Sequence, residues 1–157
     1  MKTRHLSIAL GLAVCVGGAL AQTTWKANCI TSGASAPETV GEGHVFWVSA
    51  ATCVLVGGPL DGAVVTQNAI WENIKGAGTL LSGDGVVRKT GGAAAYRSDT
   101  GTMKTLTQDG KPVGWEASGT SVSTLDTGSA ASLKGKRASW TAKATGPKTY
   151  VIENKLD

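Results

Sequence analysis

The amino-acid sequence predicts an all-β fold: a single antiparallel barrel of about eight strands that follows a cleaved N-terminal signal peptide. Short runs of alternating apolar and polar residues recur along the chain, and glycine-bearing breaks separate them. No apolar stripe with helical spacing reaches a useful length, so the pattern is typical of β-strands. Barrels and sandwiches both suit such a pattern. We favour the barrel because the strands are long for an immunoglobulin-type sandwich and the chain lacks the Cys–Trp–Cys spacing of that fold.

The first 21 residues have the three-part pattern of a secretory signal peptide. Two basic residues precede an uncharged apolar run over residues 6–16, and small residues ending at Ala21 form a cleavage site. The run is shorter than the roughly 20 apolar residues that a membrane-spanning helix needs. We therefore expect a signal peptide over 1–21, a β-barrel domain over 22–157, and a periplasmic or secreted protein with no membrane anchor.

Removal of the signal peptide changes the composition from which function is inferred. Taking 21 of the 157 residues away leaves 136, one ordinary domain, and lowers the formal charge from +4 to +2 because Lys2 and Arg4 are lost. The lysines that gather near the C-terminus are better explained as a solvated strand face than as a nucleic-acid site. We therefore predict no nucleic-acid partner.

Two cysteines, Cys29 and Cys53, lie beyond the signal peptide. An even number of cysteines in an oxidising compartment predicts one disulfide. The bond would close a loop of about 25 residues, which the chain-entropy estimate values at roughly 3–4 kcal/mol. Two cysteines without a nearby histidine fall short of the four ligands of a structural zinc site, so we predict neither a metal nor a cofactor.

The first half of the mature chain contains four predicted strands, separated by glycine, proline and aspartate residues. Residues 23–30 alternate between apolar and polar side chains, whereas residues 44–56 are more continuously apolar, which is typical of a strand buried on both faces. Strands over 63–74 and 79–89 follow. The last of these is interrupted at Ser82–Gly85, where we expect a bulge or a tight turn.

The second half begins with a weak run around Tyr96 and continues with the clearest hairpin of the sequence. Asp109-Gly110 joins residues 103–108 to residues 111–117, and it supplies the positive φ angles that both central positions of a type I′ turn require. Glycines in and beside the next strand are typical of a sheet that bends sharply in a closing barrel. Two further runs complete the predicted sheet, over residues 137–145 and 148–156.

Few residues of the mature chain are suited to catalysis. His44 is its only histidine, so a histidine-based triad or dyad would depend on it, and a multi-histidine metal site is excluded. Glu42 would orient His44 as a general base, but we favour a histidine at a strand start without a catalytic role. The glycine-rich segments 76–78 and 83–85 introduce no predicted helix, so they do not form a phosphate-binding loop.

Five tryptophans accompany a single phenylalanine, and each tryptophan lies in a predicted strand. Core packing is the favoured explanation for at least three of them, and the functional alternative is an aromatic cavity for an apolar ligand or a stacking platform for a sugar. Successive side chains of a strand point to opposite faces, so Trp71 and Glu72 cannot both be interior, nor can Trp115 and Glu116. For a hollow barrel, we select as candidate ligand-binding residues Trp47, Trp71, Glu72, Tyr96, Arg97 and Trp115.

Five short segments of the chain stand out: Trp25–Cys29, Glu42–His44, Ala51–Cys53, Gly57–Pro59 and Leu80–Val86. They resemble segments of a group of small exported bacterial proteins without an assigned function. The overall strand plan is similar to the allene-oxide-cyclase and dirigent type of barrel. That resemblance implies an eight-stranded barrel with a cavity, a scaffold that serves both cyclisation and binding.

Three functional hypotheses follow. The leading one is a barrel that binds an apolar or aromatic small molecule in its interior. The second is an enzyme of the cyclase or isomerase kind, with Glu72, His44 or Tyr96 as acid or base inside the barrel. The third is a structural or protein-interaction module with a filled core and an exposed apolar patch or strand edge. The sequence leaves the oligomeric state open.

Overall fold

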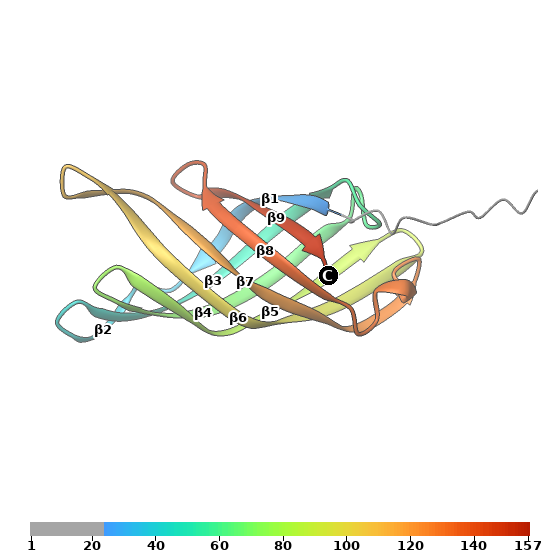
Figure 1. Ribbon diagram of the computed structural model, residues 1–157, viewed down its shortest axis with the longest axis horizontal. Helices are drawn as coiled ribbons and strands as arrows, with labels where there is room; N and C mark the ends of the chain where they lie inside the picture. The colour runs from blue at the N-terminus through green and yellow to red at the C-terminus, as the bar shows by residue number, and fades with distance from the viewer. Residues whose placement is uncertain (1–23) are drawn as a thin grey trace, which may run out of the picture.

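A computed structural model describes residues 24–157 as a closed antiparallel β-barrel (Figure 1). The predicted signal peptide lies outside these residues. The elements in chain order are β1 (Thr24–Ala34), β2 (Glu38–Gly41), β3 (His44–Val56), β4 (Val64–Ile74), β5 (Ala77–Lys89), β6 (Gly92–Gln108), β7 (Lys111–Gly128), the 3₁₀ helix η1 (Ala131–Leu133), β8 (Arg137–Ala144) and β9 (Thr149–Leu156).

Eight of these strands form the barrel. Strands β3 to β9 follow one another around the sheet, and β1 fills the place between β9 and β3. The short strand β2 pairs with the beginning of β3 and extends one end of the barrel. The predicted all-β barrel of about eight strands is therefore confirmed.

The pairing of β1 with β3 closes the sheet, and a disulfide crosses it. Cys29 and Cys53 are direct partners in the antiparallel register and are covalently joined, as the cysteine count predicts. Both side chains are buried and belong to an apolar cluster with Ala27, Leu55 and Val65. The bond therefore links two strands at the seam of the barrel from its inner side.

Alternation along the strands separates a small-residue interior from a polar exterior. Odd-numbered residues of β3 and β4 face inward, and β8 turns Ala138, Trp140 and Ala142 inward. Threonine, serine and lysine are frequent on the outer face. Many of the inward positions are alanines, namely Ala27, Ala51, Ala69, Ala94, Ala117, Ala138 and Ala142.

The predicted hairpin at Asp109-Gly110 is present, but its strands are much longer than the sequence indicates. Asp109 has a φ of 50° and Gly110 a φ of 73°, as a type I′ turn requires. Strand β6 has 17 residues and β7 has 18, because their pairing continues through serine, threonine and glycine on both faces. Because these residues make the two faces of the strands similar in hydrophobicity, the alternation in the sequence is weak there.

A bulge lies at Leu81, one residue before the interruption predicted at Ser82–Gly85, and the strand makes no turn in that range. Ile70 pairs with Ser82 and Trp71 with Leu80, so Leu81 is the extra residue of β5. Strand β5 continues beyond it, and Gly85 lies against the ring of Tyr96 on β6. A side chain at position 85 would occupy the space of that ring.

Gly119 of β7 tests how tightly the wall is packed. A Cβ atom there would collide with the Thr100 carbonyl oxygen and with the Trp140 ring. A Cβ atom at Gly114 of the same strand would meet only the Ala144 methyl, at an ordinary contact distance of 3.7 Å. We predict that Gly119→Ala lowers the free energy of unfolding by about 1–3 kcal/mol. Gly114→Ala, the matched control, should change it by less than about 0.5 kcal/mol. Urea unfolding measures both, and equal effects would contradict this packing.

The disulfide gives a second prediction. Replacing both cysteines, Cys29→Ala with Cys53→Ala, should lower the free energy of unfolding by about 3 kcal/mol, because the unfolded chain regains the freedom of the open loop. The measurement is urea unfolding of the double variant beside the oxidised and the reduced wild type. Reduced wild type should be destabilised to a similar extent. No loss of stability in either sample would show that the seam holds without the bond.

Candidate functional site

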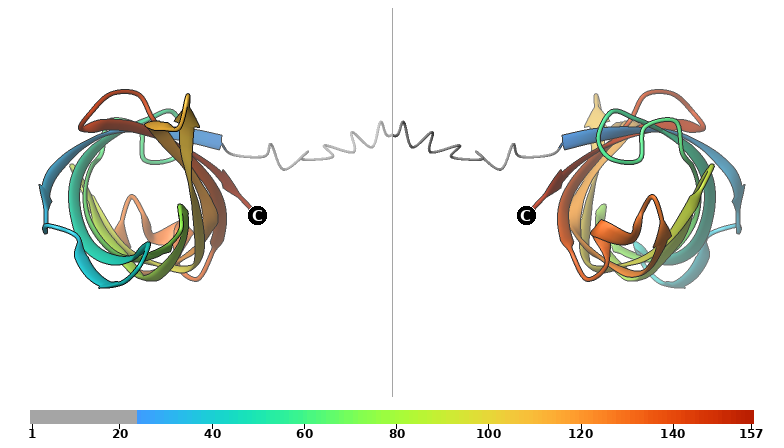
Figure 2. Two further views of the ribbon diagram at one scale, coloured as in Figure 1. Left: turned by 90° about the vertical axis from the view of Figure 1, so that its left-hand side faces the viewer. Right: turned by 90° about the vertical axis from the view of Figure 1, so that its right-hand side faces the viewer.

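The barrel encloses a cavity of about 490 Å³ that all eight of its strands line. Figure 2 shows the barrel from its two ends. At one end, the loop between β3 and β4 contributes Leu60 and η1 contributes Leu133, and both leucines are buried and reach the cavity wall. In the right-hand view, both segments lie at this end of the barrel, the loop at its upper rim and η1 in its lower part.

All five tryptophans line this cavity. Trp71 belongs to an apolar cluster with Ala117 and Ala142, and other aromatic residues border it. Trp47 and Trp71 are register partners on β3 and β4, and their rings lie nearly parallel with centroids 6.5 Å apart. Trp115 packs at an angle against Tyr150, with centroids 5.3 Å apart. The wall therefore presents several flat aromatic faces.

The inward side chains do not fill the interior. Among the described residues, Cys53 is the largest side chain with less than 2 % of its surface exposed. Trp47, Trp115, Trp140 and Tyr96 point inward yet are only partly buried. Their exposed area faces the cavity. Eight strands enclose just enough space for large side chains, and this barrel has small alanine side chains at many of the inward positions.

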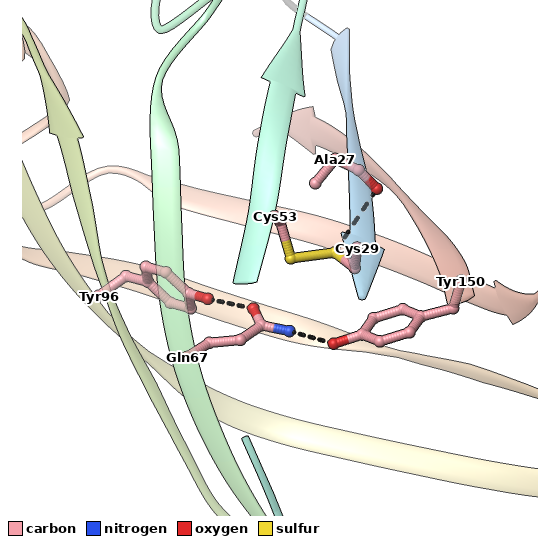
Figure 3. The surroundings of a disulfide bond; sticks show 6 residues. All are labelled: Ala27, Cys29, Cys53, Gln67, Tyr96 and Tyr150. Atoms are coloured by element: carbon pink, nitrogen blue, oxygen red, sulfur yellow. Dashed lines mark hydrogen bonds between the residues drawn. A yellow bond between two sulfur atoms is a disulfide. The ribbon is translucent and has the colours of Figure 1, made fainter. Parts of the chain in front are cut away.

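Three polar side chains form a hydrogen-bonded network inside the cavity (Figure 3). The Tyr96 hydroxyl donates to Gln67 Oε1 at 2.6 Å, and Gln67 Nε2 donates to the Tyr150 hydroxyl at 2.8 Å. The three residues come from β6, β4 and β9, and all line the cavity. Tyr150 is also the register partner of Cys29, so the network lies beside the disulfide.

Burial keeps both phenols protonated. It is the main cause that raises the pKa of Tyr96 well above its usual range, and the nearby Tyr150 and Asp84 raise it further. Burial also raises the pKa of Tyr150, although the hydrogen bond from Gln67 partly opposes this shift. Both hydroxyls therefore act as neutral hydrogen-bond donors and acceptors at physiological pH.

Four of the six candidate ligand-binding residues lie at the cavity, namely Trp47, Trp71, Tyr96 and Trp115, and two do not. Glu72 and Arg97 each follow an inward aromatic residue in the chain, so the alternation of the strand turns them outward. Trp71 and Trp115, rather than Glu72 and Glu116, are therefore the interior members of the two Trp-Glu pairs.

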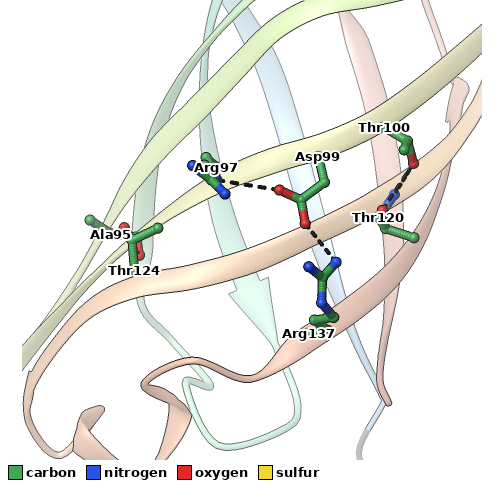
Figure 4. Close-up of polar contacts among 7 residues, drawn as sticks. All are labelled: Ala95, Arg97, Asp99, Thr100, Thr120, Thr124 and Arg137. Atoms are coloured by element: carbon green, nitrogen blue, oxygen red, sulfur yellow. Dashed lines mark hydrogen bonds and ion pairs between the residues drawn. The ribbon is translucent and has the colours of Figure 1, made fainter.

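The outward residues have partners of their own. His44 Nε2 lies 2.8 Å from Glu72 Oε1 on the outer face, so Glu72 rather than Glu42 is the carboxylate partner of the histidine. Arg97 and Arg137 both contact the carboxylate of Asp99, at 3.3 and 2.6 Å (Figure 4). These contacts lie on the outer surface, and neither His44 nor Glu72 reaches the cavity.

Sequence reasoning did not select Gln67 and Tyr150, although both line the cavity. Gln67 lies between Val65 and Ala69 on the inward face of β4. Its alternation with these two apolar residues was the sequence pattern that could have placed it in the interior. Tyr150 shares its face with Ile152 and Leu156, as the alternation of the last strand indicates. Gln67 and Tyr150 are 83 positions apart in the sequence, so their contact could be predicted only from the strand register of the closed barrel.

The described part of the chain contains no group of three or more histidine, cysteine, aspartate or glutamate residues that could hold a metal ion. It also contains no helical segment with the length and hydrophobicity that a bilayer crossing requires. Comparisons with known protein families, with curated proteins and with solved structures found no match.

The two tyrosines provide a direct test of the cavity's polar network, because the chain contains no others. We predict that tyrosinate absorbance of the native protein stays low beyond pH 10, whereas the urea-unfolded chain titrates near pH 10. The unfolded state then ionises first, so the free energy of unfolding should fall as the pH rises above about 10. A native titration at the ordinary tyrosine pKa would show that the phenols are solvated.

Proposed function

We propose that this protein binds an apolar or aromatic small molecule inside its barrel. The observation that carries the proposal is the cavity of about 490 Å³, lined mainly by apolar side chains and by five tryptophans. Ligand pockets commonly measure about 300–1,000 Å³ and combine apolar walls with a few placed polar groups. The Tyr96–Gln67–Tyr150 network provides such groups.

The position of the ionisable residues favours binding over catalysis. A cyclase or isomerase needs an acid or a base that touches the reacting atoms. Of the three candidates, only Tyr96 lines the cavity, since His44 and Glu72 pair with each other outside it. The hollow interior also argues against a structural module, for which a filled core is expected.

We further propose that the protein is exported and that the mature chain begins at Gln22. The Cys29–Cys53 disulfide is compatible with an oxidising compartment outside the cytosol. The proposal rests otherwise on the sequence pattern of residues 1–21.

Filling the cavity should abolish binding without unfolding the protein. Ala69 faces inward and is only partly buried, so Ala69→Phe places a ring in the cavity. Ile70→Phe is the matched control, because Ile70 is 39 % exposed on the outer face of the same strand. We expect naphthalene binding, measured by equilibrium dialysis, to fall at least about tenfold in Ala69→Phe and to be unchanged in Ile70→Phe. Equal binding by both variants, or none by the wild type, would contradict an interior site.

Intact mass spectrometry tests the export proposal. The full-length gene product, expressed in a bacterium with a periplasm, should be recovered from that compartment as a chain that starts at Gln22 and holds one disulfide. A variant in which Ala19 and Ala21 are both replaced by leucine should keep the N-terminal segment, since large residues block the cleavage site. A wild-type chain recovered from the cytosol with residues 1–21 attached would refute the proposal.

A further inference from the structure

The hydrogen-bonding capacity of the Tyr96–Gln67–Tyr150 network is not exhausted within the protein. Two phenols carry two hydroxyl hydrogens, and the Gln67 carbonyl accepts one of them, from Tyr96. The Tyr150 hydroxyl accepts from Gln67 Nε2, and its own hydrogen has no acceptor among the described residues. If the Gln67 amide is turned by 180°, the Tyr150 hydroxyl donates to its oxygen and the Tyr96 hydroxyl accepts from its nitrogen. The Tyr96 hydroxyl hydrogen is then the one without an acceptor. In either arrangement, one phenol hydrogen is free.

This free donor lies among apolar surroundings at the cavity wall. Tyr150 contacts the Trp115 ring on one side and is the register partner of Cys29 on the other. A buried donor without an acceptor costs free energy. A ligand that places an acceptor at this point should therefore bind more tightly than one that does not.

The cavity also disfavours a charged ligand. The charged residues that reach its lining are Asp84 and Lys136, and both are exposed. The rest of the lining carries no charged side chain, so an ionic group in the interior would be surrounded mainly by uncharged residues, where an unpaired charge is strongly unfavourable. The protonated phenols suit a neutral acceptor, and the flat tryptophan faces suit a planar ring.

Building on the proposed ligand-binding function, we propose that the cavity selects an uncharged, planar aromatic ligand with a carbonyl acceptor, of the aromatic ketone class, and that a phenol hydroxyl of the Tyr96–Gln67–Tyr150 network donates to the carbonyl oxygen. The tryptophan-lined wall provides affinity, and the hydroxyl fixes the orientation and the chemical class. No covalent step is involved.

Three probes of the same shape test this proposal by equilibrium dialysis against the purified protein. Acetonaphthone carries the carbonyl, isopropenylnaphthalene replaces its oxygen by a methylene group, and naphthoate replaces the neutral acceptor by a carboxylate. The ketone should bind roughly three- to tenfold more tightly than the alkene, the range of one net hydrogen bond. Naphthoate should bind most weakly. The infrared carbonyl band of the bound ketone should shift to lower frequency than in hexane.

Variants identify the donor. In Gln67→Leu, both phenol hydrogens are free, so the preference for ketone over alkene should persist. Adding Tyr96→Phe and Tyr150→Phe to Gln67→Leu makes the whole network apolar, and the triple variant should bind the two probes equally. Near-neutral stability is expected for such a complete replacement, since no polar group is left without a partner. Urea unfolding verifies that the triple variant is folded.

The outcomes separate this inference from the function on which it rests. Equal binding of ketone and alkene by the wild type, an unshifted carbonyl band, or tighter binding of naphthoate would overturn the inference and leave interior binding intact. A preference that persists in the triple variant would show that another group of the protein is the hydrogen-bond donor, and would overturn the inference as well. Failure of every probe to bind the wild type would refute both.

Discussion

Strand β1 pairs with β9 on one side and with β3 on the other, and the second pairing closes the sheet. An open sheet with this sequence would leave one apolar face of tryptophan, alanine and leucine in water. Closure turns that face inward and removes the free edges of the sheet. The disulfide joins Cys29 and Cys53 at direct partners across the seam, which restricts the unfolded chain and fixes the register of the two strands.

The choice of inward side chains then determines whether the closed barrel is filled or hollow. Valine, leucine and isoleucine at these positions would fill an eight-stranded barrel. Alanine occurs there on most strands instead, and the five tryptophans leave space between their rings. Gly85 and Gly119 allow the Tyr96 and Trp140 rings to lie close to the neighbouring strand, which pairs with their own. The cavity thus follows from residue size once the sheet has closed.

The sequence predicts the strong features of the fold and only part of the cavity. Strand β3 was placed at 44–56, its observed range, because its apolar content is dense. The expectation that both of its faces are buried was wrong, since Val48, Val54 and Val56 are exposed on the outer face. Strands β6 and β7 were underestimated because threonine, serine and glycine occur on both of their faces. The disulfide followed from counting cysteines. The sequence indicated that the tryptophans are core or cavity residues. Whether they line a cavity depends on how much space the alanines leave.

The polar centre of the cavity shows the limit of such reasoning. Tyr96 was selected because it is a polar aromatic residue in a strand. Arg97 and Glu72 were selected before it was known which residues of their strands face inward. Gln67 and Tyr150 are separated by 83 residues, and only the closed register brings them together. One residue remains unexplained: the Trp140 indole Nε1 is buried and has no hydrogen-bond partner among the described residues, and nothing in the structure accounts for it.

Ligand binding inside this barrel requires that its interior is a hollow, apolar space. A crystal structure determined under xenon pressure tests it most directly, because xenon occupies dry apolar cavities and needs no specific recognition. We expect xenon inside the barrel, between the Cys29–Cys53 disulfide and the Trp47–Trp71 pair. An interior filled by the tryptophan side chains in other rotamers, with xenon only on the outer surface, would contradict it.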